Sequence, residues 1–88
     1  MIEIKTTSGF VCQLADDAND DMELVEILSK KYDIEATRTS DLAQQLLGDQ
    51  KKALYEHIRA IHGKVSIRAV EQEMQEILQA FGDSGKNS

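Results

Sequence analysis

The sequence predicts an α+β protein that is mainly α, with an N-terminal β-hairpin packed on about four helices. Apolar and polar residues alternate over residues 2–14, on either side of a Ser8-Gly9 turn. Beyond residue 20, apolar residues recur at helical spacing instead. A two-stranded ribbon alone is marginal in water, so one face of the hairpin must pack on the helices.

The hairpin carries the single cysteine of the chain, so no intrachain disulfide can form. One alternating series runs through both strands and consists of Ile2, Ile4, Thr6, Phe10, Cys12 and Leu14. Cys12 stands among the apolar residues of this series. We therefore expect a small buried hydrophobic residue at this position and not a reactive thiol.

The first helix is expected over residues 22–32, after an acidic loop at residues 16–21. Either Asp20 or Asp21 can cap its N-terminus. The residues expected to share its apolar face are Leu24 or Val25, Leu28 and Tyr32.

Residues 33–39 are expected to form a connector. A short helix should follow, with Thr39 or Ser40 as its N-terminal cap. It should end at Leu47, because Gly48 is a C-terminal cap residue. A third helix is expected from residue 50 to about residue 62. Its signals are Asp49 as the cap, Leu54, Ile58 and Ile61 as the buried stripe, and Gly63 as the stop.

The last helix is expected over residues 67–81, between a Ser66 cap and Gly82. We expect one domain over residues 1–82 and a disordered polar tail over residues 83–88. The apolar stripe of this helix supplies the candidate partner-binding residues, which are Ile67, Val70, Met74, Ile77, Leu78 and Phe81.

The stripe can serve as core or as interface. Val70, Met74 and Ile77 are expected in the core. Leu78 and Phe81 follow at the end of the chain, past the point where a small core should be filled, so a partner or second subunit is expected to contact them. An 88-residue chain buries a modest share of its surface alone, which favours a homo-oligomer.

Charge narrows the possible partners. Residues 1–49 carry 4 basic and 11 acidic side chains, and residues 50–88 carry 6 and 5. The first part thus has a charge of −7 and the second of +1, so the acidity of the chain lies in its first half. An acidic surface repels phosphate backbones, which argues against nucleic acid. No apolar run is long enough to span a membrane and no signal peptide is visible, so a cytoplasmic location is expected.

No metal site, cofactor site or catalytic site is expected. Asp17, Asn19 and Asp21 match the start of a calcium loop, but Met22 stands where that loop needs glycine. His57 and His62 would lie about 140° apart around a helix, and a zinc site would lack further ligands. No motif for nucleophilic or metal-dependent catalysis occurs, which argues against an enzyme.

Several segments, taken in order, resemble the small tail assembly chaperones of long-tailed bacteriophages. They are the hairpin around residues 7–10, the helix start at residues 22–26, and the stretches 47–54 and 62–66 before a closing amphipathic helix. The resemblance covers roughly residues 2–81. Chaperones of this family hold the aggregation-prone tape-measure protein and deliver it to the tail tube protein.

The resemblance implies a non-catalytic chaperone that is a homo-oligomer, acts in the host cytoplasm and is absent from the mature virion. The mechanism expected is helix-on-helix holding by apolar residues. The alternative is a small acidic regulatory adaptor, antitoxin-like or anti-repressor, that covers a basic surface with residues 16–21 and Glu23.

Overall fold

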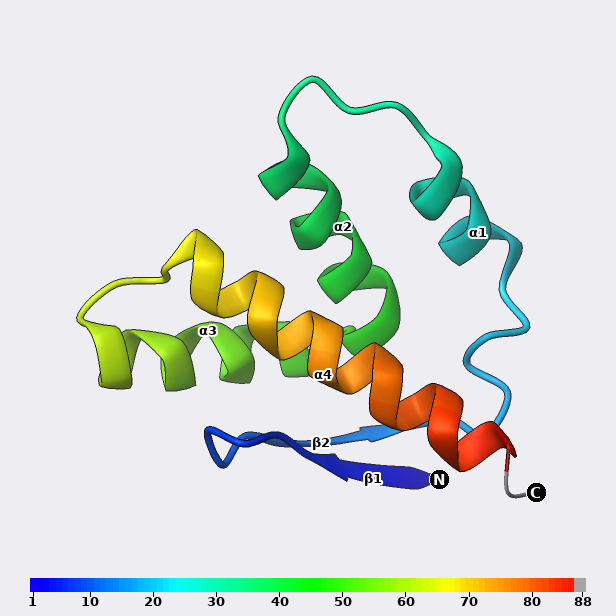
Figure 1. The fold of residues 1–88 in the computed structure, drawn as a ribbon, viewed down its shortest axis with the longest axis horizontal. Coiled ribbons are helices and arrows are strands. Elements are labelled where there is room, and N and C mark those ends of the chain that lie inside the picture. Colours follow the sequence, from blue (N-terminus) through cyan, green and yellow to red (C-terminus); the bar gives the residue numbers. More distant parts are fainter. Residues whose placement is uncertain (87–88) are drawn as a thin grey trace.

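The computed structural model describes residues 1–86, with side chains described through residue 83. Over this range an antiparallel hairpin precedes four helices (Figure 1). The elements are β1 (Ile2–Lys5), β2 (Val11–Leu14), α1 (Met22–Ser29), α2 (Glu35–Leu47), α3 (Gln50–His62) and α4 (Ile67–Lys86). The hairpin lies along the lower side of the view and the helices lie above it. The predicted α+β, mainly α fold is confirmed.

The hairpin forms as its alternating pattern predicts. β1 and β2 pair with Ile4 opposite Cys12. The turn is closed by the Gly9 N–H, which donates to the Thr6 carbonyl over 3.0 Å. Gly9 has a φ of 96°, a conformation that glycine adopts without steric cost.

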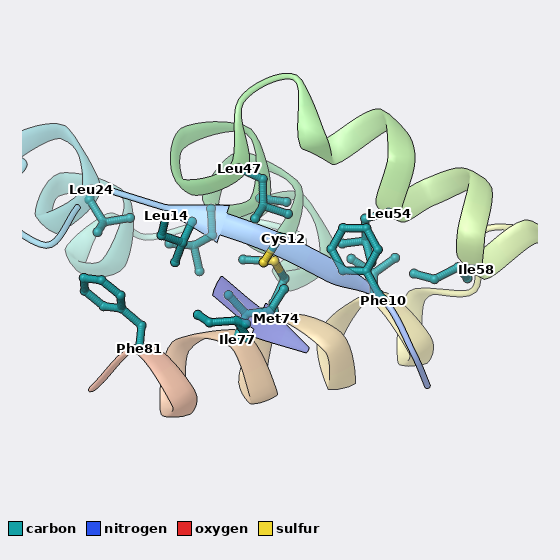
Figure 2. Close-up of a cluster of buried hydrophobic side chains, with 14 residues drawn as sticks. Phe10, Cys12, Leu14, Leu24, Leu47, Leu54, Ile58, Met74, Ile77 and Phe81 are labelled. Atoms are coloured by element: carbon teal, nitrogen blue, oxygen red, sulfur yellow. The ribbon is translucent and has the colours of Figure 1, made fainter. Parts of the chain in front are cut away.

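The core lies between the inner face of the hairpin and the helices (Figure 2). α4 contacts β1, while α2 contacts β2. Cys12 is 1% exposed, which confirms it as a buried hydrophobic residue. Burial raises the pKa of its thiol, and the nearby Glu73 carboxylate raises this pKa further, so the thiolate is disfavoured.

α1 is shorter than expected. Asp21 caps it by accepting from the Glu23 N–H over 3.0 Å, but the helix ends at Ser29 and Tyr32 lies outside it. Lys30 has extended backbone angles. The Ser29 hydroxyl bonds the Val25 carbonyl, so it shares an acceptor of the last turn.

α2 begins at Glu35, which makes the predicted connector and the predicted cap wrong. Thr39 and Ser40 lie inside the helix, and Ile34 precedes it without a side-chain cap. The Ser40 hydroxyl accepts a hydrogen bond from the Lys51 ammonium of α3 over 2.9 Å. A serine can therefore lie within a helix here because a tertiary contact uses its hydroxyl.

α3 has the predicted bounds and ends at Gly63, whose φ is 79°. Two details differ from prediction. Asp49 has helical backbone angles and makes no side-chain cap bond. Ile61 is 52% exposed, because only Leu54 and Ile58 of the predicted stripe face the core.

α4 is longer than predicted at its C-terminal end. Ser66 caps it as expected, with its hydroxyl accepting from the Ala69 N–H over 3.3 Å. The helix passes through Gly82 and continues to Lys86. The tail predicted from residue 83 is thus helical to residue 86, and residues 87–88 lie outside the described residues. Within the described part of the chain, no helix combines the length and apolar character that crossing a bilayer requires.

Candidate protein-binding surface

The α4 stripe that the sequence offers for partner binding lies mainly in the core. Val70, Met74, Ile77 and Phe81 are each at most 8% exposed, and Leu78 is partly buried. Ile67, in the first turn of α4, is 62% exposed. Five of the six candidate residues therefore present little surface to a partner while the domain is folded.

Phe81 differs most from expectation, because the core extends further along α4 than the chain length suggested. Its ring lies at the end of the core that Leu14 and Leu24 also line (Figure 2). α1 thus supplies the apolar contact that closes this end of the core. The expectation that Phe81 lies beyond a filled core is wrong for this reason.

The outer face of α1 carries the exposed apolar residues instead. Met22, Val25 and Leu28 follow one another at intervals of three and are 72%, 50% and 48% exposed. Leu24 and Ile27 lie on the other side of the helix and pack on the core. A helix that is apolar on both sides is normally buried on both sides. We call Met22, Val25 and Leu28 the α1 outer face.

Polar contacts fasten α1 to α2 and so hold the α1 outer face away from the core. The Arg38 guanidinium of α2 donates to the carbonyls of Leu28 and Lys30 over 2.9 and 2.7 Å. These carbonyls lie at the end of α1, where a helix leaves its acceptors unpaired. At the other end of α1, the Gln45 amide donates to Asp21 over 2.7 Å.

Acidic side chains precede the α1 outer face and lie along one side of it. Glu23 and Glu26 are exposed on the same helix, and the exposed Asp16, Asp17 and Asp20 precede it. Asp21 has a lowered pKa, first because Gln45 donates to its carboxylate and then because the N–H groups of the first turn do so. It stays ionised at neutral pH, so this edge of the apolar face is negatively charged.

No family model, curated protein or solved structure matches the chain.

A second polar cluster joins the hairpin turn to α4 and α3. Glu73 is 4% exposed and accepts from the Thr6 and Ser8 hydroxyls over 2.7 and 2.9 Å. His57 Nε2 lies 3.0 Å from the Ser8 oxygen. Because the one hydroxyl hydrogen of Ser8 points to Glu73, the imidazole is the donor in this contact.

The order of these groups differs from that of a serine nucleophile site. In such a site the histidine lies between the serine and the acid and accepts the serine proton. Here Ser8 lies between His57 and Glu73, and its hydroxyl donates a hydrogen bond to the carboxylate. The cluster fastens the turn to the helices, together with Glu76, which accepts from the Thr7 N–H over 2.8 Å.

An open cleft of about 490 Å³ lies beside this cluster, between the hairpin turn, α3 and α4. Ile58, Ile61 and Ala69 supply its apolar lining. Most of its carboxylate and hydroxyl groups already bond one another within the cluster, so they fasten the fold. Among the described residues, no group of three or more His, Cys, Asp or Glu is arranged to hold a metal ion.

The sequence contained a signal for the α1 outer face. Apolar residues occupy Met22, Val25 and Leu28 as well as Leu24 and Ile27, which is more than one buried face of a short helix requires. The helical spacing predicts that either Leu24 or Val25 lies on the single apolar face of α1. In the structure they lie on different faces, one buried and one exposed.

Proposed function

We propose that this chain is a non-catalytic phage tail assembly chaperone that holds the tape-measure protein in solution for the tail tube protein. The proposal combines the resemblance of residues 2–81 with one structural observation, the exposed apolar face of α1. The proposal includes action in the host cytoplasm, self-association and absence from the mature virion.

The α1 outer face is the contact surface in this proposal, in place of the α4 stripe. A short apolar stripe at helical spacing fits the apolar side of another helix. Glu23 and Glu26 beside the stripe favour a client helix with lysine or arginine next to its apolar residues. Such amphipathic segments are what a long helical client exposes before it assembles.

A small contact suits temporary holding. The α1 outer face has three apolar side chains, and fully burying one contributes about 1.5–3 kcal/mol. Association entropy offsets much of this gain, so each single contact is weak. Several copies along one client would hold it by avidity and could still be displaced by tube subunits.

The test mixes the protein with a tape-measure fragment that precipitates alone, and measures turbidity and co-elution on size exclusion. We expect the wild type to keep the fragment soluble. The variant Val25→Ser should lose most of this effect, since it removes the central apolar contact. Ile67→Ser is the matched control, because Ile67 is also at least half exposed but lies on α4. Precipitation of the fragment with the wild type present contradicts the proposal.

The acidic adaptor remains a second candidate because most carboxylates of residues 16–21, and that of Glu23, are exposed. The salt dependence of partner binding distinguishes the adaptor from the chaperone. Binding through carboxylates alone should weaken steeply between about 0.05 and 0.5 M salt, since the Debye length falls to a few ångströms. Apolar holding through α1 should persist at the higher salt. Loss of binding at high salt, with Val25→Ser binding normally, would favour the adaptor.

A further inference from the structure

The two backbone edges of the hairpin differ in what covers them. Next to the turn, Thr6 and Phe10 form a hydrogen-bonded pair, in which the Thr6 N–H donates to the Phe10 carbonyl over 2.9 Å. Hydrogen-bonded and non-hydrogen-bonded pairs alternate along an antiparallel ladder. The register places Ile4 opposite Cys12 in a bonded pair, so Glu3 and Lys5 direct their N–H and C=O groups away from β2.

The outer edge of β2 is covered at Gln13. The Gln13 N–H donates to the Gln50 side-chain oxygen, and the Gln50 amide donates to the Gln13 carbonyl, each over 2.8 Å. The side chain of Gln50 therefore takes the place that one residue of a further strand would occupy. These two bonds also agree with the alternation of bonded and non-bonded pairs along the ladder. Gln13 lies opposite Glu3, and its backbone groups point away from β1.

The outer edge of the hairpin's first strand is covered by Glu76 at Thr7 but is open at Glu3 and Lys5. Within residues 1–86, no hydrogen bond uses the outward N–H or C=O groups of Glu3 and Lys5. An open edge is a template for strand addition. Both side chains are exposed on the outer face of the hairpin, and Ile4 between them is buried on the inner face.

We propose that two copies of this chain associate through β1, which pairs antiparallel with the same strand of a second copy about a twofold axis at Ile4. In this register Glu3 lies opposite the partner's Lys5, and Lys5 lies opposite the partner's Glu3. Each such pair joins outward-pointing backbone groups, so the two pairs exchange four hydrogen bonds. The two hairpins become one four-stranded sheet.

The charges of Glu3 and Lys5 favour this antiparallel register, and they favour a second copy of the chain as the strand that pairs with the edge. The antiparallel arrangement about Ile4 places opposite charges across the strands twice, on the solvent-exposed face. A parallel arrangement in register would place Glu3 beside Glu3 and Lys5 beside Lys5, which is unfavourable. The strand is thus complementary to itself in one orientation. This surface is separate from the α1 outer face, so the proposal does not depend on the client.

The experiment measures self-association of the full chain by sedimentation equilibrium between about 10 μM and 1 mM, since a contact below about 1,200 Å² gives a weak dimer. Glu3→Lys and Lys5→Glu each create two like-charge pairs and should weaken the dimer at least about tenfold. The double variant E3K/K5E restores opposite charges and should restore the dimer. An equimolar mixture of the two single variants should form a heterodimer, because their charges are complementary.

A second measurement locates the contact. Amide spectra recorded over the same concentrations should shift at residues 3–5, and hydrogen exchange should slow at the Glu3 and Lys5 amides. A strict monomer at 1 mM overturns the proposal. So does a dimer that the single charge swaps leave unchanged, or one whose spectral shifts fall on α1. Unchanged circular dichroism of all variants is the control, since these side chains are exposed and lie outside the core.

Discussion

α1 and α4 are both amphipathic helices with glutamates beside apolar residues, yet the fold uses them in opposite ways. α4 contacts β1, α2 and α3 and buries its apolar stripe from Val70 to Phe81. α1 packs mainly on α2 and leaves Met22, Val25 and Leu28 exposed. α1 stands at the edge of the molecule in Figure 1, whereas α4 crosses its middle.

The difference shows that an apolar stripe stays exposed when no element of the chain is left to cover it. α4 packs against three other elements, β1, α2 and α3, so its stripe completes the core. α1 needs one side for its contact with α2 and the core, and its second apolar side remains outside. The shorter helix therefore offers the better candidate surface.

The largest effect is expected from Ile77→Ala. This side chain is fully buried on α4, and truncating a buried isoleucine to alanine costs about 2–5 kcal/mol. Urea unfolding followed by circular dichroism gives the change in unfolding free energy. Val25→Ala on α1 is the matched control and should change it by less than about 0.5 kcal/mol. Equal losses in the two variants would contradict the division between the helices.

A smaller effect is expected from Glu73→Gln, which tests how α4 holds the hairpin turn. The buried carboxylate accepts from Thr6 and Ser8, and an amide can accept at only one of its two ends. Leaving one of these two hydroxyls without its acceptor should cost about 1–3 kcal/mol, with the larger loss if it is the buried Thr6. Unfolding by urea measures this loss. Glu71→Gln, exposed on the same helix, should have no measurable effect.

The smallest effect is a pH dependence carried by Asp21 at the start of α1. Its pKa is lower in the folded protein, so its stabilisation is present above the unfolded pKa and is lost as pH falls through the folded pKa. Asp21→Asn should flatten the stability curve below about pH 4. Urea unfolding at several pH values checks this. Asp20→Asn removes a neighbouring charge, and an equal flattening there would contradict the Gln45 bond and the cap bonds of Asp21 as the cause.

Glu76 provides the corresponding pH-dependent contact on α4. The Thr7 N–H lowers the pKa of its carboxyl, with further lowering by the Gln72 amide and the Thr7 hydroxyl. The same sign applies, so Glu76→Gln should also flatten the curve in acid. Local amide shifts should then change at the hairpin turn and not on α1, which separates the two helices in one titration.

Local signals predicted much of the fold. Alternation predicted the hairpin, and Gly48 and Gly63 ended their helices where expected. Local signals gave wrong helix bounds where contacts with residues far along the sequence determine where a helix begins or ends. Thr39 and Ser40 resemble a helix start, but α2 begins at Glu35 and the Ser40 hydroxyl bonds Lys51. Gly82 resembles a helix stop, but α4 continues to Lys86.

By itself, the sequence determined the class of fold, the hairpin, the inner face of each strand and the apolar face of α4, because these depend on periodicity along one segment. Only the tertiary structure decided that Phe81 is core and that the α1 outer face is exposed. Burial depends on which other elements arrive at a face, and no single segment encodes that. For the same reason only the tertiary structure decides that Gln50 covers the outer edge of β2 at Gln13, while β1 is open at Glu3 and Lys5.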